Sequence, residues 1–141
     1  MMQVREVMTG KPEYLDVSAS ILEASQRMRD AGRGFTPIAE KETIIGVVTD
    51  RDIAIRAVAE GRSPNEKVST ILTGKVLYCF QDDDVKDVLQ SMQTNDVQRL
   101  IVLNNEKNKD FVGVVTVGDI ADKCQDDDMA RRIVNASRHY Y

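Results

Sequence analysis

The sequence predicts an α/β protein of two pseudo-symmetric repeats, each with a small, mostly antiparallel or mixed three-stranded sheet and two helices. Three observations favour this class. A nine-residue segment at 46–54 returns at 113–121 with seven identical residues. Short β-type apolar runs alternate with apolar residues at helical spacing. Polar clusters typical of helix starts and turns separate these runs, in the same order in both halves.

The repeat extends upstream of this segment. The tripeptide at 9–11 returns at 73–75, and Tyr14 returns as Tyr78. The lag is 64 residues here and 67 residues in the later part, because three residues are inserted within 104–110. A doubled unit of this size implies two similar halves with equivalent sites.

Each repeat begins with a short extended stretch and a first helix. Polar clusters at 16–20 and 81–84 predict the helix starts, because Ser and Asp side chains accept hydrogen bonds from free backbone N–H groups. Apolar residues then follow at helical spacing from Ile21 and from Val85. In the first repeat, Gly32 and Gly34 are expected to end this helix.

Two β-type runs and a second helix complete each repeat. The runs lie at 35–39 and 43–49 in the first repeat, and at 99–103 and 111–116 in the second. A polar turn between each pair predicts a hairpin. The second helix is expected to start directly after each hairpin, and in the first repeat Gly61 is expected to end it.

We expect repeat 1 to span residues 1–62, repeat 2 to span 63–124, and a C-terminal helical tail to span 125–141. Three aspartates at the start of this tail suit the positive end of a helix dipole. The tail is interpreted as a solvated or frayed terminal helix, with a docking or dimer segment as the alternative. One face of the tail helix is apolar: Met129, Ile133 and Ala136.

Composition excludes several classes of protein. With 42% hydrophobic and 30% charged residues, the chain has the composition of a soluble globular protein. The net charge of −4 argues against binding to duplex nucleic acid. No apolar run is long enough for a membrane span, the N-terminus has no signal-peptide pattern, and two cysteines are too few for a disulfide framework or a zinc site. We therefore expect a cytoplasmic protein without membrane or nucleic-acid partners.

Two copies of a Thr-x-x-Asp motif are the main candidates for chemistry. Thr49 with Asp52, and Thr116 with Asp119, fall where a strand is expected to turn into a helix. One interpretation is a helix capping box. The other is a ribose site, since a carboxylate there can accept hydrogen bonds from two vicinal hydroxyls and the Thr hydroxyl can bind further sugar or phosphate oxygens. Repetition of both motifs with the same flanking residues favours a functional role.

At these motifs the chain resembles a tandem CBS-domain pair, also called a Bateman module, of the stand-alone kind. The resemblance covers roughly residues 1–124 and is carried by Val7-Met8-Thr9, by 34–38 and by 46–53. It implies an adenosyl ligand (AMP, ADP, ATP, S-adenosylmethionine or NAD) in clefts between the repeats, as an effector and not as a required cofactor. It also implies a homodimer and signalling to a separate partner protein.

The resemblance further assigns roles to single residues. Asp52 and Asp119 would bind ribose hydroxyls, with Thr49 and Thr116 beside the sugar or phosphate. Other positions would flank the base: Lys11, Pro12, Phe35, Pro37, Lys75, Val76, Arg99 and Ile101. From its charge, Arg51 is a candidate for phosphate binding, with a solvated first-turn residue as the alternative.

The two repeats are not equivalent. Asp50-Arg51 of the first repeat is replaced by Val117-Gly118 in the second. Arg99 stands where the first repeat has Phe35, and is either a phosphate ligand or a surface ion-pair residue. These differences leave open whether both clefts bind, and whether they prefer the same ligand.

The function predicted from the sequence is a non-catalytic regulatory module that binds an adenosyl ligand. The alternative is a constitutive homodimeric scaffold with empty or vestigial clefts. A small enzyme is disfavoured, because no base or nucleophile lies near either motif and His139, the only histidine, falls in the tail. No catalytic residue and no metal ligand is expected.

Overall fold

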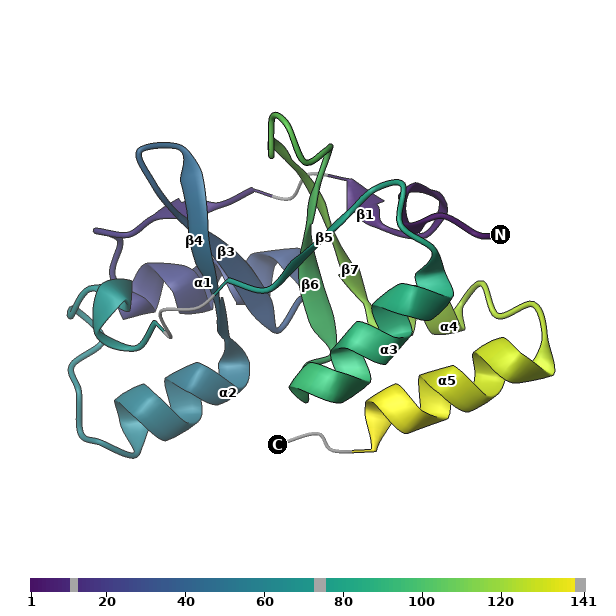
Figure 1. Ribbon diagram of the computed structural model, residues 1–141. Coiled ribbons are helices and arrows are strands. Elements are labelled where there is room, and N and C mark those ends of the chain that lie inside the picture. The colour runs from purple at the N-terminus through teal and green to yellow at the C-terminus, as the bar shows by residue number, and fades with distance from the viewer. Residues whose placement is uncertain (11–12, 73–75, 139–141) are drawn as a thin grey trace. The chain divides into compact units, whose positions relative to one another are not determined.

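The computed structural model describes residues 1–10, 13–72 and 76–138 (Figure 1). Lys11, Pro12, Lys75 and His139 lie outside the described residues. The chain divides into two compact units. The first-repeat unit comprises Glu13–Val76, and the second-repeat unit comprises Met1–Pro12 together with Leu77–Tyr141.

The first-repeat unit contains a three-stranded sheet with the order β2-β3-β4. Strand β2 is parallel to β3, and β3 forms an antiparallel hairpin with β4. A buried apolar cluster joins the sheet to its helices and includes Ile38 and Val48. The elements in chain order are β2 (Leu15–Asp16), α1 (Ile21–Ala31), β3 (Phe35–Glu40), β4 (Thr43–Thr49), α2 (Asp50–Asp52), the π-helix η2 (Ile53–Val58) and the 3-10 helix η3 (Val68–Thr70).

The second-repeat unit contains the same hairpin and parallel strand in a four-stranded sheet with the order β1-β7-β6-β5. This confirms the predicted α/β class, with one strand more than expected in the second sheet. The elements are the 3-10 helix η1 (Val4–Glu6), β1 (Thr9–Gly10), β5 (Tyr78–Phe80), α3 (Val85–Asn95), β6 (Arg99–Leu103), β7 (Phe111–Thr116), α4 (Val117–Ala121) and α5 (Asp127–Ser137).

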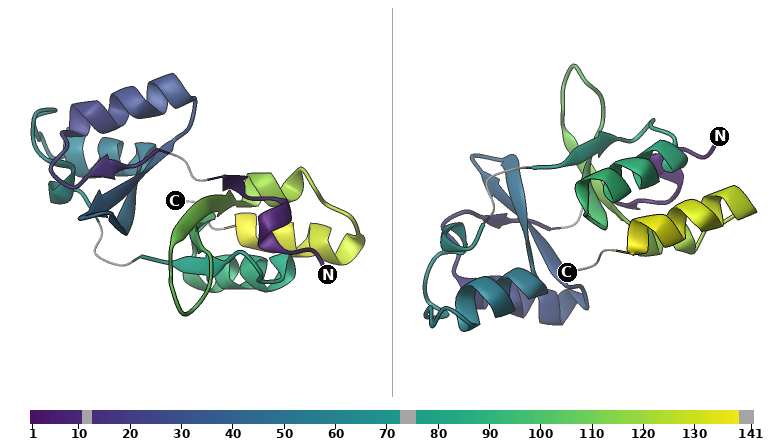
Figure 2. Two further views of the ribbon diagram at one scale, coloured as in Figure 1. Left: turned by 90° about the horizontal axis from the view of Figure 1, so that it is seen from above. Right: turned by 60° about the horizontal axis from the view of Figure 1, so that its bottom comes forward.

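The additional strand comes from the N-terminus. Strand β1 lies beside β7 (Figure 2). Thr9 pairs with Val114, and Gly10 pairs with Gly113. A Cβ atom at Gly113 would lie 2.5 Å from the Thr9 carbonyl oxygen, so the close approach of β1 depends on this glycine. Val4 is fully buried in the core of the same unit. The compact units therefore differ from the sequence repeats, since the first residues of repeat 1 pack with repeat 2.

Helix ends follow the polar and glycine signals. The Ser20 hydroxyl accepts a hydrogen bond from the Glu23 N–H, and the Asp84 carboxylate accepts one from the Lys86 N–H. Gly32 ends α1 in the left-handed conformation, at φ 65°. These positions confirm the predicted starts of α1 and α3 and the predicted end of α1.

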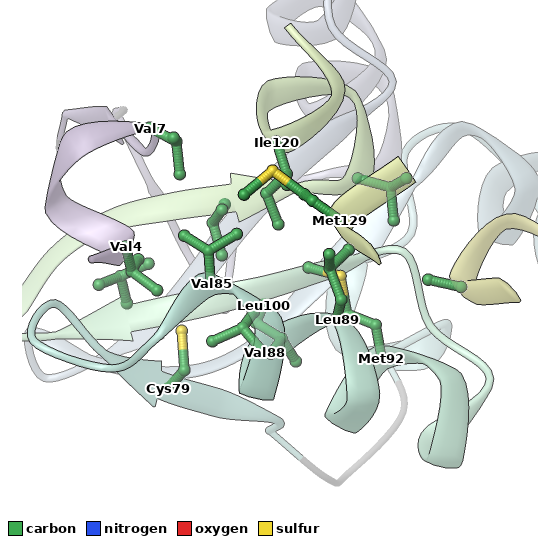
Figure 3. Packing of buried hydrophobic residues seen from close by; sticks show 14 residues of the cluster. Val4, Val7, Cys79, Val85, Val88, Leu89, Met92, Leu100, Ile120 and Met129 are labelled. Carbon is green, nitrogen blue, oxygen red and sulfur yellow. The ribbon is translucent and has the colours of Figure 1, made fainter. Parts of the chain in front are cut away.

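The tail forms helix α5, which packs against α3 and α4. Figure 3 shows Met129 in one apolar cluster with Leu89 of α3 and Ile120 of α4. Met129 is only 2% exposed, and Ala136 is also buried. The apolar face was predicted, but the interpretation of the tail as a solvated or frayed helix was wrong. It was wrong because this face completes the core of the second-repeat unit.

Ion pairs hold the start of α5 to α3. The Lys86 ammonium lies 3.4 Å from Asp126 Oδ2 and 3.1 Å from Asp128 Oδ2. The hydrogen bond from Lys86 lowers the pKa of Asp128, and the backbone hydrogen bond from Met129 lowers the pKa of Asp126. In the first repeat the position of Lys86 is occupied by Leu22, which is exposed. The ion pairs that hold α5 to α3 are thus a specific feature of the second repeat.

In the described part of the chain, no helix combines the length and the apolar character that a membrane crossing requires.

Candidate functional site

Each repeat places its Thr-x-x-Asp motif at the junction between a hairpin and a short helix. Thr49 is the last residue of β4 and the N-cap of α2, and Asp52 is the last residue of α2. Thr116 is the last residue of β7 and the N-cap of α4, in which Asp119 is the third residue. The prediction that each motif lies where a strand turns into a helix is confirmed. We call these two segments the first turn (49–56) and the second turn (116–123).

Reciprocal hydrogen bonds close both turns. In the first turn, the Thr49 N–H donates to Asp52 Oδ2 at 2.9 Å, and the Asp52 N–H donates to Thr49 Oγ1 at 3.1 Å. In the second turn, the equivalent distances between Thr116 and Asp119 are both 3.0 Å. Both motifs are therefore capping boxes, which confirms the first of the two interpretations given above. The bonds use only one oxygen of each carboxylate and leave Oδ1 for other donors.

The residues that begin β3 and β6 lie opposite these threonines. Phe35 is in register with Thr49, and Arg99 is in register with Thr116. Both side chains are half-buried. The structure thus brings together, within each unit, a strand residue and a Thr-x-x-Asp motif that are separated in the sequence.

Pro37 and Ile101 occupy equivalent places two residues further along β3 and β6. Side chains alternate along a strand, so each shares a sheet face with Phe35 or Arg99. Both are buried, and Ile101 is 2% exposed. They therefore form the buried base of this face, whereas Phe35, Arg99 and the Thr and Asp residues of both motifs are half-buried.

The remaining predicted residues are more scattered. Arg51 is exposed in α2, where its backbone N–H donates to Asp50 Oδ1 at 2.8 Å. Val76 is half-buried and precedes β5. Lys11, Pro12 and Lys75 lie outside the described residues, so their roles stay predictions.

Asp50, which also differs between the repeats, has a structural role. Its N–H donates to the Gly34 carbonyl oxygen at 2.8 Å. A Cβ atom at position 34 would lie 2.5 Å from the Asp50 carboxylate, so this carboxylate occupies the space that Gly34 leaves open. In the second repeat the Val117 N–H donates to the Gln98 carbonyl oxygen at 3.0 Å, which preserves the backbone bond without the carboxylate.

Arg56 contacts the first turn and was not among the predicted site residues. Its Nε atom lies 3.7 Å from Asp52 Oδ1, the oxygen that the capping box leaves unused. The spacing of four residues between an acid and an arginine was the available signal, because residues four apart meet on one face of a helix. The corresponding residue of the second turn, Lys123, is exposed.

The chain is thus a tandem-repeat protein with paired candidate ligand sites. Each repeat has a capped strand-to-helix turn with an aspartate of which the capping box uses only one carboxylate oxygen. The chain belongs to the CBS domain family, whose model matches residues 4–58 and 68–126. This confirms the resemblance inferred from the motifs.

Relatives and solved structures agree with this assignment. The chain is 32% identical over 123 residues to the Bacillus subtilis protein YlbB, covering 86% of this chain and 81% of that protein. It is similar to Hypoxic Response Protein I, crystallised with two coordinated zinc ions, with a TM-score of 0.77, 26% identity, and coverage of 88% of this chain and 100% of that chain. It is also similar to the CBS domain pair of protein MJ0100, in complex with 5′-methylthioadenosine and S-adenosyl-L-methionine, with a TM-score of 0.74, 25% identity, and coverage of 86% and 94%.

Among residues 1–10, 13–72 and 76–138, no group of three or more His, Cys, Asp and Glu side chains is placed to hold a metal ion. Of the two cysteines, Cys79 is buried and its pKa is raised to about 12 by desolvation, while Cys124 is exposed.

Proposed function

We propose that this protein is a non-catalytic regulatory module that binds an adenosyl ligand at its two turns. The observation that carries the proposal is the duplicated geometry at Asp52 and Asp119. Both carboxylates are held by the same pair of hydrogen bonds, and in both the same oxygen remains for a ligand. A fixed acceptor oxygen of this kind suits the vicinal hydroxyls of a ribose, which donate two hydrogen bonds to one carboxylate.

The adenosyl class of ligand is supported by family membership and by the complexes of MJ0100, whose two ligands share an adenosine part. We propose that Asp52 and Asp119 receive the ribose hydroxyls, with Thr49 and Thr116 beside the sugar. Phe35 and Arg99, in register with the threonines, would border the ligand. AMP, ADP, ATP, S-adenosylmethionine and NAD all contain the recognised part, and any of them would act as an effector.

The test is a thermal-shift screen of the full chain against these ligands, with GTP as the control nucleotide. We expect the adenosyl ligands to raise Tm, because a ligand at a hundredfold over its Kd stabilises a folded protein by about 2.7 kcal/mol. For a chain of this length this corresponds to a shift of several degrees. If no adenosyl ligand changes Tm, the proposal is wrong and the constitutive scaffold becomes the better account.

We further propose that the module acts in the cytoplasm as a homodimer that signals to a separate partner protein. Exposed apolar side chains on the first-repeat unit support the dimer. Leu22 of α1 is 43% exposed, and Ile55 and Val58 of η2 are 51% and 73% exposed. The equivalent positions of the second repeat are polar: Lys86, Asp122 and Gln125.

Light scattering coupled to size-exclusion chromatography tests the dimer. The wild-type chain is expected to elute with twice its monomer mass of 15.8 kDa. Ile55→Asp should shift it to the monomer, because a charge at an apolar interface is costly to desolvate. Val134→Asp, on the exposed side of α5, is the matched control and should not change the mass. A monomeric wild-type chain would contradict the dimer and leave the ligand proposal untouched.

A further inference from the structure

The two repeats have equivalent helix faces that are covered differently. In the second-repeat unit, α5 packs against both α3 and α4 (Figure 1). The equivalent face of the first-repeat unit is formed by α1, α2 and η2. Its apolar side chains Leu22, Ile55 and Val58 are exposed. Among the described residues, a helix therefore covers this face in one unit and leaves these side chains open in the other.

Helix α5 covers apolar surface of α3 and α4. Met129 and Ala136 of α5 are buried in one cluster with Leu89 and Met92 of α3 and Ile120 of α4. Leu89, Met92 and Ile120 are 0% exposed. Because α5 fills this face, its displacement would bring apolar side chains to the surface, where they favour association.

Polar contacts hold both ends of α5. At its start, the Lys86 ammonium lies 3.4 Å from Asp126 Oδ2 and 3.1 Å from Asp128 Oδ2. At its end, Gln98 Nε2 donates a hydrogen bond to the Ser137 carbonyl oxygen at 3.2 Å. The face that receives α5 thus combines apolar packing with a charged contact at one end and an amide contact at the other.

The first repeat has different residues at the positions that receive α5. Lys86, Leu89 and Gln98 correspond to Leu22, Ser25 and Gly34. The carboxylates at the start of a docked α5 would face Leu22 there, and a carboxylate without a polar partner is costly to desolvate. The Ser25 hydroxyl donates to the Ile21 carbonyl oxygen at 3.1 Å, in place of the apolar contact of Leu89. Helix α5 is therefore specific to the second repeat, and the first-repeat face is suited to an apolar occupant.

Building on the proposed dimer, we propose that α5 is an intramolecular cap that closes the second repeat to self-association and confines the dimer contact to the first-repeat faces of two copies. A two-fold contact brings the same apolar patch of each copy together and removes it from water without a charged partner. Opening the cap should add a second association step, because it exposes the equivalent face of the second repeat.

Crosslinking of matched cysteine variants tests which face lies at the dimer contact. Val58 and Val134 are 73% and 61% exposed, and each lies on a helix of a different unit. The background is Cys124→Ser, which removes the exposed native thiol, while Cys79 is buried with its pKa raised to about 12 and reacts slowly. With a bismaleimide, Val58→Cys should be joined between copies at least about tenfold faster than Val134→Cys, since dimer contact raises the effective concentration of the thiols.

Opening the cap tests the role of α5 in the full chain. In an Ile55→Asp background, expected to be monomeric, Lys86→Glu places a carboxylate beside Asp126 and Asp128, and Met129→Ala removes the main apolar contact. The α5 amides should then exchange with solvent at least about tenfold faster. Light scattering should show a concentration-dependent rise from 15.8 kDa to twice this mass.

Two further variants control this experiment. Lys86→Glu alone, in the same background, keeps the apolar contacts and should associate in the same way at higher concentration, which serves if the combined variant does not fold. Val134→Ala in the same background changes an exposed residue of α5 and should stay monomeric.

The outcomes separate this inference from the proposed dimer. Equal crosslinking of Val58→Cys and Val134→Cys in a dimeric chain would overturn the confinement to the first repeat and leave the dimer standing. An opened α5 in a chain that stays monomeric would overturn the cap, as would unchanged exchange of the α5 amides in both opening variants. A monomeric wild-type chain would refute the proposed dimer, and the confinement with it.

Discussion

Replacing Asp52 with alanine should weaken adenosyl-ligand binding at the first turn by about tenfold to a hundredfold, and Asp119→Ala should do the same at the second turn. Each change removes the carboxylate that we assign to the ribose hydroxyls, and hydrogen bonds to a charged group contribute about 1.5–3 kcal/mol each. It also removes half of a capping box, so a loss of about 1 kcal/mol in stability is expected beside the loss in affinity.

Isothermal titration with the ligand found in the screen measures this effect. Two binding events in the wild-type chain should become one in each variant. Asp122→Ala is the control. Asp122 is an exposed acid directly after α4 in the second turn, and its replacement changes the net charge by the same amount. Titrations of both Asp52→Ala and Asp119→Ala that match the wild type would refute the assignment of these carboxylates.

Replacing Met129 with alanine should lower the free energy of unfolding by about 2–4 kcal/mol, the usual cost of truncating a large buried side chain. Met129 is 2% exposed and lies in the same cluster as Leu89 and Ile120 (Figure 3). The change would leave a cavity where α5 packs against α3 and α4, and would loosen the tail helix from its unit.

Urea denaturation followed by far-UV circular dichroism measures the loss as a fall in the midpoint concentration. Val134→Ala is the matched control on the same helix, because Val134 is 61% exposed, and its effect should stay within about 0.5 kcal/mol. If Met129→Ala unfolds at the wild-type midpoint, α5 is not part of the folding unit and the packing described above does not persist in solution.

Much of the local structure could be predicted because its signals are local. The strands β3, β4, β6 and β7 match the apolar runs to within about a residue, and Ser20, Asp84 and Gly32 mark helix ends as expected. The Thr-x-x-Asp motifs gave two interpretations. The structure confirms the capping one, while the ligand role stays a prediction, since a capped carboxylate with a spare oxygen is compatible with both.

The features that were missed depend on packing between distant segments. A two-residue strand such as Thr9–Gly10 has no periodicity of its own, and its partner is set by the bare backbone of Gly113. The apolar face of α5 was visible in the sequence, but not the surface that it covers. The spacing of Arg56 and Asp52 is that of a helical ion pair, but only the fold shows that this pair forms at the carboxylate oxygen that the capping box leaves unused.

The pairing of β1 with β7 has a consequence for how the chain folds during synthesis. Residues of the first-repeat unit, Glu13–Val76, are contiguous, so this unit has all its residues once position 76 has left the ribosome. Thr9, by contrast, leaves the ribosome roughly a hundred residues before its partner Val114. The backbone groups of Thr9 cannot pair with β7 until β7 has been synthesised. Their pairing then closes a long loop, which costs entropy. Residues 1–10 are made before the first-repeat unit, yet they belong to the unit that is completed after it.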